Sequence, residues 1–137
     1  MKIAVVYWSG TGNTKAMAEA MAAEIGADLF SVLAVKASDL KDYDGILWGC
    51  PAMGMEELEE AEFQPVYTDA LKYTKGKKVG LFGSYGWGTG EWLEIWTDDA
   101  KAKGLDVTGT LAVNNTPDEA GLAKCREFAK EFKEQVG

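Results

Sequence analysis

The chain has 137 residues, of which 47% are hydrophobic and 26% charged, and its formal net charge is −8. A chain of this length fits one domain, which can bury enough apolar surface to fold without disulfides or a structural metal. The acidic balance argues against nucleic acid as a ligand, because a phosphate backbone needs a Lys/Arg footprint, and it also argues against an anionic membrane surface.

Histidine is absent from the chain. This absence removes Ser-His-Asp and Cys-His catalysis and the commonest metal ligand. Cys50 and Cys125 have no paired spacing, so neither a zinc site nor a disulfide framework is predicted. The N-terminal apolar run is too short for a signal-peptide core, and no stretch is long enough to span a membrane, so we expect a cytoplasmic protein.

Apolar runs of strand length alternate with helical patterns along the chain. The first predicted strand, 3–8, is a continuous β-rich run, and a helix over 13–25 follows it and ends at Gly26. Further strands are predicted at 29–35, 45–50, 78–84 and 105–113, and further helices at 65–73, 91–103 and 118–136. This order predicts a single α/β domain over 1–137, a parallel sheet covered by helices on both faces.

Ligands of such sheets bind beyond the carboxyl ends of the strands, at a switch point in the strand order. The first loop at such an end holds Ser9, Gly10, Thr11, Gly12, Asn13 and Thr14. Its two glycines let backbone N–H groups point inward, and the start of the next helix adds free N–H groups and a partial positive charge. Together with the three hydroxyl groups, they can hold a terminal phosphate without a cation.

Two other phosphate-binding patterns fail in this loop. No glycine is followed by Lys and Ser or Thr, and Lys15 stands where the dinucleotide pattern needs its third glycine. An ordinary turn with a helix cap at Asn13 or Thr14 stays open as the alternative.

The loop after the third strand, 50–57, contains groups suited to a flat ring. Met53 offers a polarizable surface, Gly54 permits a peptide flip, and Glu56 can accept a hydrogen bond from a ring N–H. By itself, the segment is more typical of a turn that leads into an acidic helix start.

The loop after the fourth strand, 83–92, places Tyr85 and Trp87 among four glycines. An aromatic ring flanked by glycines suits stacking on a ligand, although both rings could instead cover the edge of the core. Trp92 and Trp96 lie on the next predicted helix, and we expect them in the core. Asn115 could bind a ligand or form a turn.

Four motifs, at 8–14, 50–54, 83–88 and 115–118, together resemble the short-chain flavodoxins of anaerobic bacteria. The resemblance covers nearly the whole chain in the right order. It implies a flavodoxin-like doubly wound three-layer sandwich whose five-stranded parallel sheet has the order 2-1-3-4-5. It also implies a single domain that binds FMN non-covalently.

The resemblance assigns roles to individual positions. The loop 9–14 would hold the FMN phosphate, Met53 and Trp87 would cover the two faces of the isoalloxazine, and the carbonyl of Gly54 would turn toward flavin N5. Glu56 would accept from flavin N3–H. Met55 stands after the flipping glycine, where the family carries a small or acidic residue. The implied cofactor-binding residues are Ser9, Gly10, Thr11, Gly12, Asn13, Thr14, Ala52, Met53, Gly54, Met55, Glu56, Ser84, Tyr85, Gly86, Trp87 and Asn115.

The function implied is that of a low-potential one-electron carrier, not an enzyme, that cycles mainly between semiquinone and hydroquinone. Acidic residues near the ring loops would meet basic redox enzymes in transient, salt-sensitive contacts, and we expect a monomer. Two alternatives stay open: an FMN-dependent quinone or nitro-group reductase on the same fold, and a signalling receiver domain. The acidic residues are Glu56, Glu57, Glu59, Glu60, Glu62, Glu91, Glu94, Asp98 and Asp99, of which 59, 60 and 62 could instead form a solvated helix surface.

Overall fold

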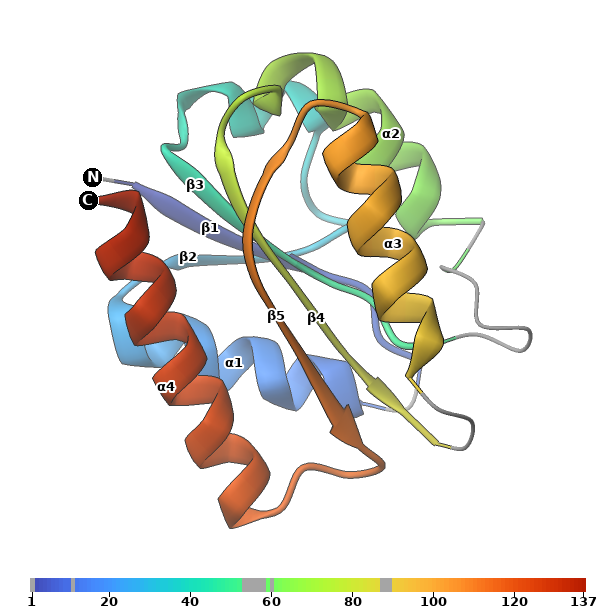
Figure 1. Cartoon of the computed structure of the whole chain (residues 1–137), viewed down its shortest axis with the longest axis vertical. Coiled ribbons are helices and arrows are strands. Elements are labelled where there is room, and N and C mark those ends of the chain that lie inside the picture. Colours follow the sequence, from blue (N-terminus) through green and yellow to red (C-terminus); the bar gives the residue numbers. More distant parts are fainter. Residues whose placement is uncertain (1, 11, 53–58, 60, 87–89) are drawn as a thin grey trace.

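The computed structural model describes residues 2–10, 12–52, 59, 61–86 and 90–137 (Figure 1). Within these residues, five parallel strands form one sheet in the order β2-β1-β3-β4-β5, as predicted. Because all five run in the same direction, their carboxyl ends share one edge of the sheet, and both chain termini lie at the opposite edge (Figure 1). The strands are β1 (Ile3–Tyr7), β2 (Asp28–Ser31), β3 (Gly45–Gly49), β4 (Lys78–Tyr85) and β5 (Asp106–Asn114).

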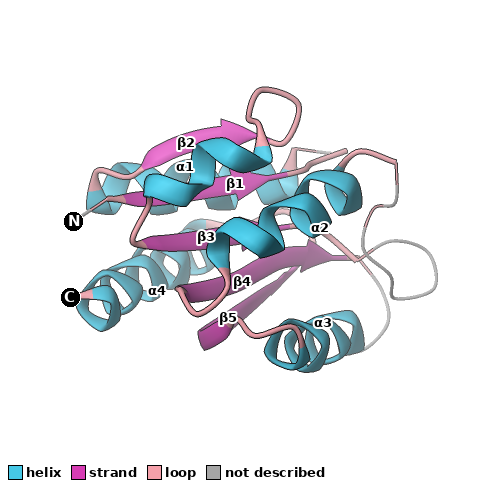
Figure 2. Cartoon of the chain, turned by 90° about the horizontal axis from the view of Figure 1, so that it is seen from above, coloured by secondary structure: helices cyan, strands magenta, loops and turns pink. Residues whose placement is uncertain are grey.

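Helices cover both faces of the sheet and make the predicted three layers (Figure 2). On one face lie α1 (Asn13–Ile25) and α4 (Glu119–Val136). On the other lie α2 (Phe63–Thr74) and α3 (Glu91–Ala102), and a short 3-10 helix, η1 (Ala37–Asp42), packs beside α2. The helix α1 has the predicted bounds, because its apolar residues recur at helical spacing and Gly26 ends it in the left-handed conformation.

The central strands are buried on both faces, which explains their continuous apolar sequences. Val5 and Leu47 face α1 and α4, whereas Val6 and Trp48 face α2 and α3. Four aromatic side chains pack together on the second face, mostly edge to face, with the Trp48 and Tyr67 ring centroids 5.3 Å apart. Trp92 and Trp96 are both buried in this core, as predicted. The four aromatic residues are Trp48, Phe63, Tyr67 and Trp96.

The second strand is shorter than predicted. A strand over 29–35 was expected, but β2 ends at Ser31, where the chain turns. The N–H of Ala34 donates to the carbonyl of Ser31 at 2.9 Å, and the Ser31 hydroxyl accepts from the N–H of Leu33. Val32 and Val35 are nevertheless buried, and the N–H of Val32 still donates to the Tyr7 carbonyl of β1 at 2.9 Å, so of the two only the apolar character of Val35 reflects core packing alone.

The helix η1 was not predicted, since it depends on a contact that is distant in sequence. The Lys77 ammonium donates to the carbonyls of Leu40, Lys41 and Tyr43 at the end of this helix. At its start, the carboxylate of Asp39 accepts the N–H of Lys36. The contact with Lys77 joins η1 to the start of β4.

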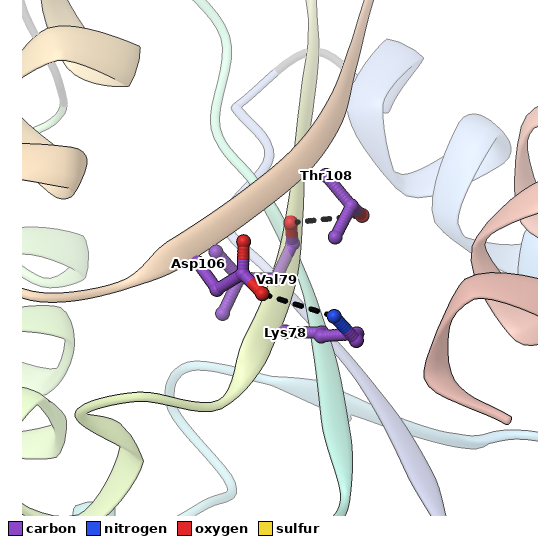
Figure 3. Close-up of polar contacts among 4 residues, drawn as sticks. All are labelled: Lys78, Val79, Asp106 and Thr108. Carbon is purple, nitrogen blue, oxygen red and sulfur yellow. Dashed lines mark hydrogen bonds and ion pairs between the residues drawn. The ribbon is translucent and has the colours of Figure 1, made fainter.

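A bulge sets the register between β4 and β5. Val79 lies opposite Val107, but Gly80 lies opposite Gly109, so Thr108 is an extra residue in β5. Its hydroxyl donates to the carbonyl of Val79 at 3.5 Å, beside an exposed ion pair of Lys78 with Asp106 (Figure 3). The shift carries through to the carboxyl ends of both strands, where Tyr85 pairs with Asn114. The bulge therefore decides which residues of β5 reach that edge of the sheet.

Candidate functional site

A cavity of about 350 Å³ opens at the carboxyl edge of the sheet. Its size lies in the range of about 300–1,000 Å³ that is usual for small-molecule sites. The chain segments that leave β1, β3, β4 and β5 all contribute to it, and it lies at the edge of the sheet where the sequence predicts a ligand. The lining residues are Trp8, Gly10, Asn13, Pro51, Ala52, Ser84, Tyr85, Gly86 and Asn115.

The loop after β1 folds onto the start of α1. The hydroxyl oxygen of Ser9 accepts the N–H of Gly12 at 3.0 Å, and Gly12 adopts φ 94°, which favours glycine. Within the described residues, the N-cap residue of α1 is Gly12, which carries no side chain, and no carboxylate lies in the first turn of the helix. No carboxylate of the first turn offsets the partial positive charge of this helix start, which therefore suits an anion.

Two other helix starts differ from α1, because carboxylates occupy them. Asp118 accepts the N–H of Gly121 at 2.8 Å at the start of α4. At the start of α2, the carboxylate of Glu59 accepts the N–H groups of Glu62 and Phe63 at 2.6 and 2.9 Å. The sequence predicts that this helix begins at residue 65. The cap explains why α2 begins at residue 63 instead.

A buried hydroxyl pair lies beneath the loop. The Thr14 side chain is 0% exposed, and its hydroxyl lies 3.1 Å from that of Ser84, which is 4% exposed. The N–H of Ser84 also donates to the Thr14 hydroxyl at 3.4 Å. In this arrangement, the Thr14 hydroxyl joins α1 to β4.

The chain that leaves β3 stays alongside β4 for several residues. The N–H groups of Cys50 and Ala52 donate to the carbonyls of Phe82 and Ser84, both at 3.0 Å. A Cβ at Gly83 would lie only 2.1 Å from the Cys50 carbonyl oxygen, so the close approach requires glycine there. This contact brings the segment after β3 to the edge of the cavity.

Cys50 also joins the two ends of the loop that follows β3. Its sulfur accepts the N–H of Glu59 at 3.4 Å, and its carbonyl accepts the indole N–H of Trp92 at 3.2 Å. Burial raises the pKa of the Cys50 thiol to about 12, so the group is an inert packing residue rather than a nucleophile.

The exits of β4 and β5 meet on the other side of the cavity. The N–H of Asn115 donates to the Tyr85 carbonyl at 2.7 Å, and the Asn114 amide donates to the carbonyls of Tyr85 and Gly86. Asn115 adopts φ 57° and forms a turn, which the sequence leaves open as the alternative to ligand binding. It also lines the cavity. Tyr85 likewise lines the cavity and contacts the core at Trp92, with ring centroids 5.7 Å apart.

Trp8 and Pro51 line the cavity although they were not among the predicted binding residues. Trp8 directly follows β1 and Pro51 lies two residues beyond the end of β3, and this position at a strand exit is the signal that could have identified them. The indole N–H of Trp8 donates to the carboxylate of Glu62 at 2.7 Å.

The structure brings most of the predicted site residues that it describes to one place. Ser9, Gly12 and Thr14 belong to the predicted phosphate loop, 9–14, but do not line the cavity. The residues that line it are Gly10, Asn13, Ala52, Ser84, Tyr85, Gly86 and Asn115. The predicted residues Thr11, Met53, Gly54, Met55, Glu56 and Trp87 lie outside the described residues.

A second hollow, of about 470 Å³, lies between α3 and β5. It is larger than the first, but two of its lining side chains are the carboxylates of Glu94 and Asp98. An anionic ligand would be repelled there, so the cavity at the carboxyl edge is the better phosphate site. Among the residues that the structure describes, no acidic, Cys or His cluster could hold a metal, and no helix could cross a membrane.

A family model described as Flavodoxin matches residues 5–128 of the chain. The chain belongs to the flavodoxin family. The flavodoxin of Megasphaera elsdenii is 48% identical over 133 residues, which cover 93% of this chain and 96% of that protein. The flavodoxin of Clostridium beijerinckii is 45% identical over 134 residues, which again cover 93% of this chain and 96% of that protein. The solution structure of two-electron reduced M. elsdenii flavodoxin has a TM-score of 0.85 at 46% identity, over 96% of this chain and 98% of that one.

Flavodoxins are electron carriers rather than enzymes, and they bind FMN. The likeness to two flavodoxins confirms the resemblance to the short-chain type and does not favour the alternative of a quinone or nitro-group reductase. The cavity fits FMN in its chemistry, since a helix start without a carboxylate in its first turn suits the phosphate and an aromatic side chain borders the space for a ring.

Proposed function

We propose that the chain is a low-potential one-electron carrier whose single domain, 1–137, holds FMN at the carboxyl edge of the sheet. The observation that carries the proposal is a cavity at the N-terminus of α1, where no carboxylate lies in the first turn, bordered by four strand exits. When bound, FMN supplies the redox chemistry, and the residues of the chain bind it, orient it and tune its potential. We propose that the protein cycles mainly between the semiquinone and hydroquinone states.

The phosphate is assigned to the loop 9–14. The backbone N–H groups at the start of α1 and the Ser9 hydroxyl would donate to its oxygens. The Thr14 hydroxyl supports the site from below, since it is buried against Ser84. The exposed Asn115 amide lies at the opposite border of the cavity, where it would contact the ribityl chain or the ring edge.

The ring is assigned to the side of the cavity that is bordered by Ala52 and Tyr85. We carry over from the sequence the roles of Met53 and Trp87 as the two ring covers. The carbonyl of Gly54 would accept a hydrogen bond from flavin N5, Glu56 would accept one from N3–H, and Met55 would influence how easily the peptide of Gly54 turns.

Electron transfer partners are proposed to be basic proteins that dock transiently beside the ring. Glu91, Glu94 and Asp98 of α3 are exposed, and within the described residues they form no ion pair. Glu59 and Glu62 are less available, because their carboxylates accept hydrogen bonds inside the chain. The docking charges are therefore assigned to α3, and the chain is proposed to act as a cytoplasmic monomer.

Titration of the apoprotein with FMN and with riboflavin tests the binding proposal. We expect quenching of flavin fluorescence at one equivalent of FMN and clearly weaker binding of riboflavin, because riboflavin lacks the phosphate. Equal affinity for both flavins would place the phosphate outside the loop 9–14. Steady oxidation of a nicotinamide without a partner reductase would instead support the enzyme alternative.

A further inference from the structure

Trp8 lies between β1 and the loop 9–14 that is assigned to the phosphate. It directly follows β1, and its ring lies over Gly10, where a Cβ would be 3.0 Å from the ring atom Cη2. Both Trp8 and Gly10 line the cavity. The position of the Trp8 ring therefore limits the conformations that the phosphate loop can adopt.

A single long-range hydrogen bond orients this ring. The indole Nε1–H of Trp8 donates to Glu62 Oε1 at 2.7 Å, across 54 positions in sequence, and both side chains are partly buried. Glu62 is itself held in place, because its N–H donates to the carboxylate of Glu59 at 2.6 Å. A short hydrogen bond to a charged acceptor is stronger than a neutral one, so it can oppose rotation of the indole.

We propose that Glu62 is a positioning residue for FMN binding. Its carboxylate holds the Trp8 ring against Gly10, and the ring holds the phosphate loop in the shape that receives the phosphate. Glu62 touches Trp8 and not the cavity, so it acts through Trp8. The proposal rests on the placement of the FMN phosphate in the loop 9–14.

The proposal predicts a loss of flavin affinity that is seen only when the flavin carries the phosphate. Glu62→Ala should lower FMN affinity about tenfold, the effect of losing one charge-assisted hydrogen bond, with little change in riboflavin affinity. Glu62→Gln should restore most of the FMN affinity, since its amide oxygen still accepts the indole N–H although the charge is gone. Glu134→Ala on α4, an exposed carboxylate far along the chain, is the matched control and should leave both affinities unchanged.

Trp8→Phe keeps an aromatic ring but removes the N–H donor. The proposal predicts that it lowers the ratio of FMN to riboflavin affinity as Glu62→Ala does, and that the double variant is no worse than either single one. In the wild-type protein, the Trp8 indole proton should exchange slowly with solvent in nuclear magnetic resonance spectra. This last measurement needs no variant to fold.

The possible results separate this inference from the proposed function. A wild-type protein that binds neither flavin would overturn both. A wild-type protein that prefers FMN, together with a Glu62→Ala variant of unchanged FMN-to-riboflavin ratio, would overturn the role of Glu62 alone. Fast exchange of the Trp8 indole proton, or a Glu62→Gln variant as weak as Glu62→Ala, would contradict the hydrogen-bond mechanism.

Discussion

The hydroxyl groups of Thr14 and Ser84 meet in the core at 3.1 Å, directly beneath the loop that is assigned to the phosphate. Thr14 belongs to the first turn of α1, and Ser84 lies near the carboxyl end of β4. The pair therefore joins the element that is proposed to bind the phosphate to the strand whose exit borders the ring side of the cavity.

The first prediction concerns this hydroxyl pair. Thr14→Val should destabilise the apoprotein by about 1–3 kcal/mol, because the Ser84 hydroxyl then lacks its buried partner. Ser84→Ala should have a similar effect, and the double variant should cost less than the sum of the two single ones. Urea unfolding of the four proteins measures this coupling. Strictly additive losses would show that the two hydroxyl groups do not depend on each other.

The second prediction concerns the cap of α2. Burial raises the pKa of the Glu59 carboxyl, but the N–H groups of Phe63, Glu62 and Ala61 outweigh burial and hold the pKa below its ordinary value of 4.5. A carboxyl with a lowered pKa stabilises the folded state above its unfolded pKa, and that contribution is lost as the pH falls through the folded pKa.

Glu59→Ala should therefore lower the free energy of unfolding by about 1 kcal/mol near neutral pH, the usual effect of losing a helix cap. The difference from wild type should shrink in strongly acidic buffer. Urea unfolding at several pH values checks both statements. A difference that stays constant into acid would mean that the ionised carboxylate is not the capping group.

The third prediction concerns the two cysteines. Burial raises the pKa of Cys50 to about 12 and that of Cys125 to about 11, so neither thiol is ionised near neutral pH. Both should resist an alkylating reagent in the native protein and react in denaturant, as mass spectrometry would show. Rapid native labelling of Cys50 alone would indicate that its contact with Glu59 opens readily in solution.

The fourth prediction concerns the proposed docking face. Glu94→Lys with Asp98→Lys should slow electron transfer to a basic acceptor protein about tenfold at low salt and weaken its salt dependence. Glu127→Lys with Glu131→Lys provides a matched control, because these exposed residues have the same spacing on α4, which covers the other face of the sheet. Stopped-flow absorbance measures the rates, and equal slowing by both pairs would point to net charge rather than to a local docking face.

Local patterns in the sequence predict much of this fold. The uninterrupted apolar run of β3 and the helical spacing in α1 give clear signals, because a doubly buried strand and an amphipathic helix each impose a period on the sequence. The cavity was likewise predictable, since glycines and hydroxyl residues gather after the strands. The strand order came from the resemblance to the flavodoxins, since right-handed connections between parallel strands only narrow the possible topologies.

The remaining features depend on side chains that are distant in sequence. Trp8 meets Glu62 across 54 positions and Thr14 meets Ser84 across 70, so no local pattern indicates either pair. The bulge at Thr108 has the same origin, since it depends on how two strands align. The early end of β2 was missed because Val35 is buried without belonging to the strand.

Stepwise anaerobic reduction of the FMN-loaded protein, followed by visible absorbance, tests the central claim most directly. A one-electron carrier should pass from the yellow oxidised form through a long-wavelength absorbing intermediate that accumulates after one electron and disappears after two. Direct bleaching, with no such intermediate at any stage of the titration, would contradict the claim of one-electron transfer while leaving FMN binding intact.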